Sequence, residues 1–178
     1  MKSYYVRQGL IFGLVNILLA LIIYFMGADF LAGHFFLVPG LLLIVAIVFP
    51  IVITIRYRTM NGGFLPFKDA FWVSFMVLVI SGLIAAVFGI ILYHVIDPEY
   101  PKLIQQKMTE HLTEWMTNAG LSEDKIQESL SKNNMEEKFS IMGQVKGYLF
   151  SIIFYAILSL IIAAIAKRNK PPFESEVL

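Results

Sequence analysis

Four ionisable side chains near the ends of apolar segments are the residues of this sequence whose types and spacing could do chemistry. His94 and Asp97 are three residues apart, and Asp29 lies five residues before His34. Residues three apart share one face of a helix, and a His-x-x-Asp pair can ligate a metal ion. Polar residues also gather at membrane boundaries simply because they are solvated there. Whether these four form a site is therefore open, and we assign no catalytic, cofactor-binding or metal-binding residue.

Other site chemistries find little support. The sequence has no cysteine, which excludes thiolate metal sites, disulfides and cysteine nucleophiles. Asn61-Gly62-Gly63 is glycine-rich, but it lacks the lysine and hydroxyl of a phosphate-binding P-loop and follows no strand. Asn and Gly tolerate positive φ, so we interpret this segment as a turn. We expect a protein that is not an enzyme and that carries no cofactor.

The elements that would position these residues are long apolar helices. Of the 178 residues, 58% are hydrophobic, and the net charge of +1 lacks the basic footprint of nucleic-acid binding. The segment 70–96 has no charged residue and is long enough, as a helix, to cross a bilayer. We predict an all-α polytopic membrane protein, a single membrane domain over residues 1–178. Its four transmembrane helices are expected at about residues 9–26, 35–55, 70–96 and 147–166.

The first apolar segment resembles a secretory signal because Lys2 and Arg7 precede it. It is about twice as long as a normal signal-peptide core and lacks a convincing cleavage site. We therefore expect an uncleaved first span.

Small residues recur at helical spacing in three of the spans, which favours close helix–helix packing in lipid. We expect Tyr155, in the middle of span four, to find a hydroxyl partner in Asn16 or Ser81. Pro50 is expected to kink span two. The small-residue rows are Gly9, Gly13, Asn16 and Ala20; Ser74, Leu78, Ser81, Ala85 and Gly89; and Gly143, Gly147, Ser151, Tyr155, Ser159 and Ala163.

Residues 97–146 change in composition, with apolar residues at helical spacing among many charged ones. Ala119-Gly120 is a good helix end, and Ser122 is a good N-cap for a second helix reaching about Asn133. We predict an extramembrane amphipathic helical hairpin between spans three and four. Whether it lies on the membrane or binds a partner protein is left open.

The distribution of Lys and Arg predicts the orientation. Two precede span one, none lies in residues 27–34, three lie in 56–69, and three follow span four. The segment 97–146 has six lysines, offset by nine acids. We expect both termini and the Asn61 turn in the cytoplasm and residues 97–146 in the extracytoplasmic (periplasmic) space.

Several short motifs carry a resemblance: Asn61-Gly62-Gly63 with Phe67, Ala70-Phe71 at the start of span three, and Asp97-Pro98 at its end. With the helical insert before span four, the chain resembles a family of four-span bacterial membrane proteins, common in the Bacteroidota. This family is known as domain of unknown function forty-one ninety-nine. The resemblance implies an inner-membrane location and four spans, and it brings no assigned activity.

Three functions compete. No ionisable residue lies deep in a span, where charges mark ion or proton pathways, so we favour a non-enzymatic structural, accessory or partner-binding protein, including a homo-oligomer. The alternative is a component of a small-solute or ion transporter or channel, using Asn16, Pro50, Tyr155 and the membrane level of His34 and His94. A membrane-boundary enzyme would have to use Asp29, His34, His94 and Asp97.

Overall fold

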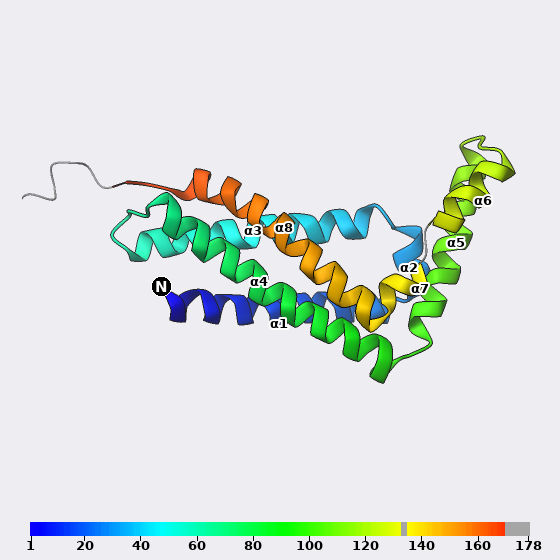
Figure 1. Ribbon diagram of the computed structural model, residues 1–178, viewed down its shortest axis with the longest axis horizontal. Helices are drawn as coiled ribbons and strands as arrows, with labels where there is room; N and C mark the ends of the chain where they lie inside the picture. Colours follow the sequence, from blue (N-terminus) through cyan, green and yellow to red (C-terminus); the bar gives the residue numbers. More distant parts are fainter. Residues whose placement is uncertain (133–134, 170–178) are drawn as a thin grey trace, which may run out of the picture. The chain divides into compact units, whose positions relative to one another are not determined.

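A computed structural model describes residues 1–132 and 135–169, and these are helical almost throughout (Figure 1). Their only extended pairing is a single antiparallel bridge between Leu65 and Arg168. The helices are α1 (Lys2–Met26), α2 (Ala28–Gly33), α3 (Leu37–Met60), α4 (Phe67–Ile91), the π-helical turn η1 (Leu92–Ile96), α5 (Tyr100–Asn118), α6 (Glu123–Lys132), α7 (Met135–Phe139) and α8 (Ile141–Ala166).

Four helices among the described residues are long and apolar enough to cross a membrane: α1, α3, α4 together with η1, and α8. The predicted all-α class with four candidate spans is confirmed. The helices extend beyond the predicted bounds, with α1 beginning at Lys2 and α8 at Ile141. The prediction followed apolar composition, whereas a helix satisfies its backbone hydrogen bonds in water as well and so continues into the polar flanks.

Helix α3 remains helical through Pro50. The Thr54 hydroxyl donates a hydrogen bond of 2.7 Å to the Pro50 carbonyl, one turn back. This bond satisfies the buried hydroxyl within its own helix, as is common for threonine in an apolar helix.

Contacts divide the chain into two units, and the division falls inside α1, α3, α4 and α8. Unit 1 comprises Met1–Val15, Leu42–Ile84 and Phe150–Leu178, and unit 2 comprises Asn16–Leu41 and Ala85–Leu149. The single membrane domain over residues 1–178 stays a prediction.

Unit 1 is held together by close approaches between helices. A Cβ added at Gly9 would lie 2.8 Å from the Cβ of Ile80, and one at Gly13 would lie 2.9 Å from the Cβ of Ile84. These two glycines therefore let α1 and α4 approach at distances that a side chain would forbid, as expected for helix pairing in lipid.

Other contacts in unit 1 are made by aromatic side chains and by small residues. The rings of Phe12 and Phe49 stack at 4.3 Å between centroids, and the Tyr4 hydroxyl donates to the Ile53 carbonyl at 3.0 Å. The hydroxyl of Tyr155 lies against Gly82, 2.6 Å from the position of a Cβ there. The predicted row on span four is buried only in its last part, at Ser159 and Ala163, and Gly147 borders open space.

Backbone hydrogen bonds join the turn between α3 and α4 to the end of α8, also within unit 1. Leu65 and Arg168 exchange two backbone hydrogen bonds of 2.8 Å. The Arg58 side chain donates to the Ala166 carbonyl at 3.1 Å, one of the last carbonyls of α8. Unpaired carbonyls at a helix C-terminus are stabilised by cations, so Arg58 caps α8. Of the predicted basic tail, Lys170 lies outside the described residues.

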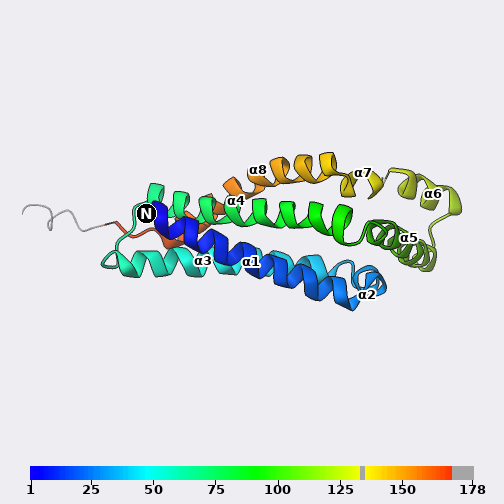
Figure 2. The ribbon, with the colours of Figure 1, turned by 90° about the horizontal axis from the view of Figure 1, so that it is seen from below.

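Unit 2 contains the helical insert. A turn at Gly120, with φ of +76°, joins α5 to α6, as predicted for Ala119-Gly120 (Figure 1). Helix α6 is described to Lys132, and the predicted end at Asn133 lies outside the described residues. Two short helices, α2 and α7, were not predicted. Figure 2 shows α2 beside α5, and the two helices pack against each other.

Candidate functional site

The four residues that could have formed a metal site each bind a separate partner. The imidazole Nδ1 of His34 lies 2.9 Å from the Phe30 carbonyl of its own helix α2, and Nε2 of His94 lies 3.1 Å from the Phe139 carbonyl. Asp29 pairs with Lys107 at 3.2 Å, and Asp97 accepts from Tyr24 at 3.0 Å. Within residues 1–132 and 135–169, no three His, Cys, Asp or Glu side chains are grouped to hold a metal ion. The contacts of Asp29, His94 and Asp97 fasten the insert of unit 2, whereas that of His34 is local.

Asp97 joins three elements where η1 ends and α5 begins. Its Oδ1 accepts from the backbone N–H of Tyr100 at 3.1 Å, and its Oδ2 accepts from the Tyr24 hydroxyl of α1 at 3.0 Å. An aspartate that accepts from an N–H three residues on satisfies one of the unpaired donors of a helix start. One carboxylate therefore sets the start of α5 and attaches it to the end of α1.

Tyr100 lies at the centre of the apolar contacts of this junction. It is only 6% exposed and packs with Ala28 and Ile104, and its ring meets that of Tyr24 edge-on at 4.7 Å. Its hydroxyl is buried without a hydrogen-bond partner. Burial disfavours the phenolate and raises the pKa of Tyr100 to about 12, with smaller contributions from Tyr93, Tyr24 and Asp97.

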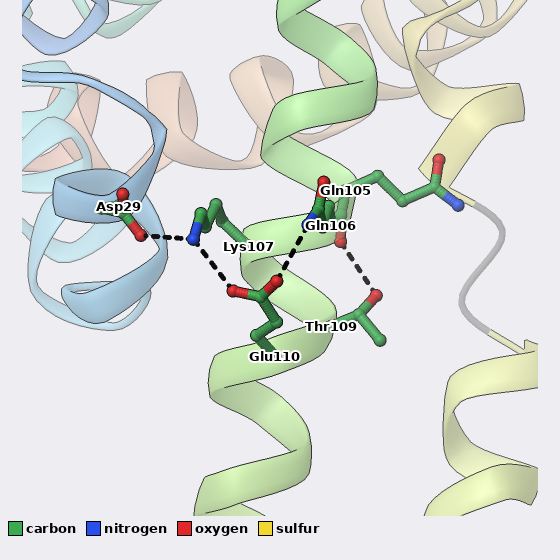
Figure 3. A network of polar contacts seen from close by, with 6 residues as sticks. All are labelled: Asp29, Gln105, Gln106, Lys107, Thr109 and Glu110. Carbon is green, nitrogen blue, oxygen red and sulfur yellow. Dashed lines mark hydrogen bonds and ion pairs between the residues drawn. The ribbon is translucent and has the colours of Figure 1, made fainter.

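A polar network ties α2 to α5 (Figure 3). The ammonium of Lys107 lies between two carboxylates, 3.2 Å from Asp29 on α2 and 3.0 Å from Glu110 on α5. The amide of Gln106 donates to the other oxygen of Glu110 at 3.0 Å. The Lys107 side chain is only 26% exposed, so its stem is covered while its charged end reaches both carboxylates.

The charges of this network shift one another's pKa values. The pKa of Lys107 is raised, first by its hydrogen bond to Glu110 and then by that to Asp29. The pKa of Glu110 is lowered, first by Lys107 and then by Gln106. Both shifts favour the charged forms, so the network is fully formed between the ordinary pKa of a glutamate and that of a lysine.

One face of α5 follows the connection between the first two spans. Ile104 and Met108 pack in the cluster around Ala28, and His111 lies beside Gly33, 3.7 Å from the position of a Cβ there. Farther along, the Trp115 ring meets the rings of Phe35 and Phe36 edge-on, at 6.3 and 6.2 Å. The sequence predicted the helical spacing of this face of α5. It did not predict that the face packs against the connection between the first two spans.

Helix α2 and the roles of Lys107 and Tyr24 were not predicted from the sequence. A signal for α2 exists: Ala28 and Ala32, both buried, are four residues apart and fall on one helical face. Tyr24 gave no signal, since a tyrosine at the end of a span is also typical of a membrane boundary.

A family model described as "Protein of unknown function (DUF4199)" matches residues 7–168, which is most of the chain. The chain belongs to this family. The resemblance inferred from the sequence motifs is thereby confirmed. No curated protein and no solved structure matches the chain.

Membership in the DUF4199 family brings no assigned reaction, so the chemistry of this chain must come from its own residues. The junction of α1, α2, η1 and α5 consists of carboxylates, a lysine and tyrosines that bind one another. Such an arrangement fixes the insert in place, and we interpret it as an anchoring site.

Proposed function

We propose that this multi-pass membrane protein is non-enzymatic and that it works by holding its helical insert in a fixed position for binding another protein. The observation that carries the proposal is the docking of α5 on α2 through Lys107, between Asp29 and Glu110. A membrane-bound protein that displays a binding surface needs such an anchor because an unrestrained insert would lose entropy on binding.

The part of the insert around the end of α5 offers the proposed binding surface. Trp115 is 51% exposed and Phe36 is 70% exposed, although their rings contact each other. Leu121, just after the Gly120 turn, is also exposed. Exposed aromatic residues such as Trp are enriched at binding interfaces. The partner on this proposal is a second copy of the chain or another membrane protein.

Three buried hydroxyls of the spans favour this function over solute transport. Those of Thr54, Ser74 and Ser81 donate to carbonyls of their own helices, at 2.7, 3.0 and 3.0 Å, whereas the buried Ser159 hydroxyl has no hydrogen-bond partner among the described residues. Hydroxyls satisfied within their own helices need no solute as a partner. The transporter alternative stays a prediction, which a flux assay in proteoliposomes would test.

For the location we propose the cytoplasmic membrane, with the Asn61 turn and both ends of the sequence in the cytoplasm and residues 97–146 outside. The support is the pattern of Lys and Arg: residues 27–34 have none, whereas Arg56, Arg58 and Lys68 lie around the next turn.

Photocrosslinking tests the partner-binding role. A photoreactive amino acid replaces Leu121 on the insert or, as the matched control, the exposed Phe150 on the apolar helix α8. We expect a discrete adduct, with a second copy or with one partner protein, from position 121 and none from position 150. If position 121 yields only uncrosslinked monomer in native membranes, the proposal is wrong.

A further inference from the structure

A cavity of about 310 Å³ lies in unit 2 between η1, the first turn of α5 and the residues that precede α8. Its apolar walls include the rings of Tyr93 and Phe139, which meet edge-on at 5.0 Å, and two prolines, Pro98 and Pro101. This volume is at the small end of the range for ligand pockets, suited to a headgroup or another small polar group. Apart from His94, the side chains of the anchoring contacts described above are not among the lining residues.

The polar groups of the cavity favour an anion. Lys102 supplies an ammonium, Gln105 an amide and His94 an imidazole, and none of the lining residues within the described part of the chain is an acid. Nε2 of His94 faces the Phe139 carbonyl at 3.1 Å and must donate there, so Nδ1 of the neutral ring is an acceptor and offers no donor to an anion. Figure 3 shows Gln105 pointing to the opposite side of α5 from Asp29, so it takes no part in the network of Lys107.

The position of the cavity relative to the spans indicates where the anion comes from. His94 lies in η1, at the end of the third candidate span, and Ser140 directly precedes α8, the fourth. The neighbouring residues Val95 and Ile141 are apolar and exposed, at 73% and 53%. Exposed aliphatic side chains at the ends of spans are expected to contact acyl chains, and the headgroup layer then lies beside them.

The π-helical geometry of η1 is a second distinguishing feature. The backbone N–H of Asp97 donates to the Leu92 carbonyl at 2.9 Å, five residues back. Single turns of this kind are rare and occur frequently at functional sites. Here the wide turn contains Tyr93 and His94, two of the residues that line the cavity.

We propose that this cavity binds the phosphate headgroup of an anionic phospholipid, with Lys102 as the charged contact, Gln105 as a hydrogen-bonding contact and His94 as part of the wall. Glu99 competes for the same ammonium, because its carboxylate lies 3.1 Å from Lys102. Both side chains are well exposed, at 75% and 78%, so either can be replaced without disturbing the core. The inference does not depend on the partner-binding role of the insert.

Native mass spectrometry of the detergent-purified protein titrated with phosphatidylglycerol tests the proposal. We expect Lys102→Gln to weaken binding about tenfold, as for the loss of one charge-assisted contact, and Glu99→Gln to strengthen it. The matched control Lys125→Gln removes an exposed lysine of α6 that is not among the lining residues, and it should bind as the wild type does.

Three results would overturn the assignment, two of them from the variants and from competition and the third from a second lipid. One is equal binding by the Lys102→Gln and Lys125→Gln variants, which would show that the lipid is held by charge in general. The other is competition by inorganic phosphate alone at concentrations equal to those of the lipid, which would make the site one for free phosphate. Phosphatidylcholine should bind more weakly than phosphatidylglycerol, and equal binding of the two lipids would also contradict the proposal.

Discussion

The two units of this protein are built from different residues. The described part of unit 1 has a single acid, Asp69, and its basic residues are Lys2, Arg7, Arg56, Arg58, Lys68, Lys167 and Arg168. Unit 2 has six lysines and ten acids. Unit 1 is held together by helices that approach closely at glycines, whereas unit 2 is fastened by carboxylates, the Tyr24 hydroxyl and a lysine.

This difference predicts that the two units should be destabilised by different kinds of change. Close packing in lipid depends on volume, so unit 1 should be sensitive to added atoms and insensitive to pH. A water-facing helix with few apolar contacts depends on polar pairs, so unit 2 should respond to lost hydroxyls and to titration.

The largest effect is expected from filling a glycine of unit 1. Gly13→Val places a side chain where even a Cβ would lie 2.9 Å from the Cβ of Ile84. Overpacking of this kind should lower the free energy of unfolding by about 1–3 kcal/mol. The measurement is thermal unfolding in detergent.

Gly147→Val is the matched control, because Gly147 is also helical and nothing lies within 4 Å of its would-be Cβ. Both substitutions carry the same change in helix propensity, so the difference between them isolates the contact. Equal melting temperatures for the two variants would show that α1 and α4 do not approach at Gly13.

Smaller effects on the free energy of unfolding are expected from replacing two tyrosines of unit 2, and the two replacements should differ from each other. Tyr24→Phe removes the hydroxyl that donates to Asp97 and should lower the free energy of unfolding by about 1 kcal/mol. Tyr100→Phe removes a buried hydroxyl that has no partner and should leave stability unchanged or raise it. Thermal unfolding of the two variants checks the prediction, and a larger loss for Tyr100→Phe than for Tyr24→Phe would contradict it.

The smallest effect is expected from acid. Because the pKa of Glu110 is lowered in the folded chain, its contribution to stability is present above its ordinary value of 4.5 and is lost as the pH falls through the folded value. The melting temperature of the wild type should therefore approach that of Glu110→Gln as the pH falls below 4.5. A difference that stays constant with pH would show that the ion pair with Lys107 contributes nothing.

The same contrast explains how much the sequence could predict. Four spans followed from long uncharged segments, and the Gly120 turn followed from a residue that tolerates positive φ. The packing roles of Gly9 and Gly13 followed from their spacing, because small residues in lipid act mainly by permitting contact.

Long-range polar pairs could not be predicted in this way. Tyr24 and Asp97 are 73 residues apart, and no local pattern selects one partner for a carboxylate among several candidates. For the same reason, Asp29 and His34 looked like possible metal ligands beside His94 and Asp97, although each binds a separate partner. The row on span four failed at Gly147, which is a small residue without a neighbour, whereas Gly143 lies against the Glu137 carbonyl.

The central claim is that four helices cross a bilayer and that the insert between the last two lies in water. Because the sequence has no cysteine, single cysteines can be introduced and labelled without background. Membrane-impermeant maleimide should label Ser122→Cys on the insert of intact spheroplasts, label Asn61→Cys only after permeabilisation, and leave Leu83→Cys within α4 unlabelled until detergent is added. Labelling of positions 61 and 122 from the same side, or ready labelling of position 83 without detergent, would contradict the account.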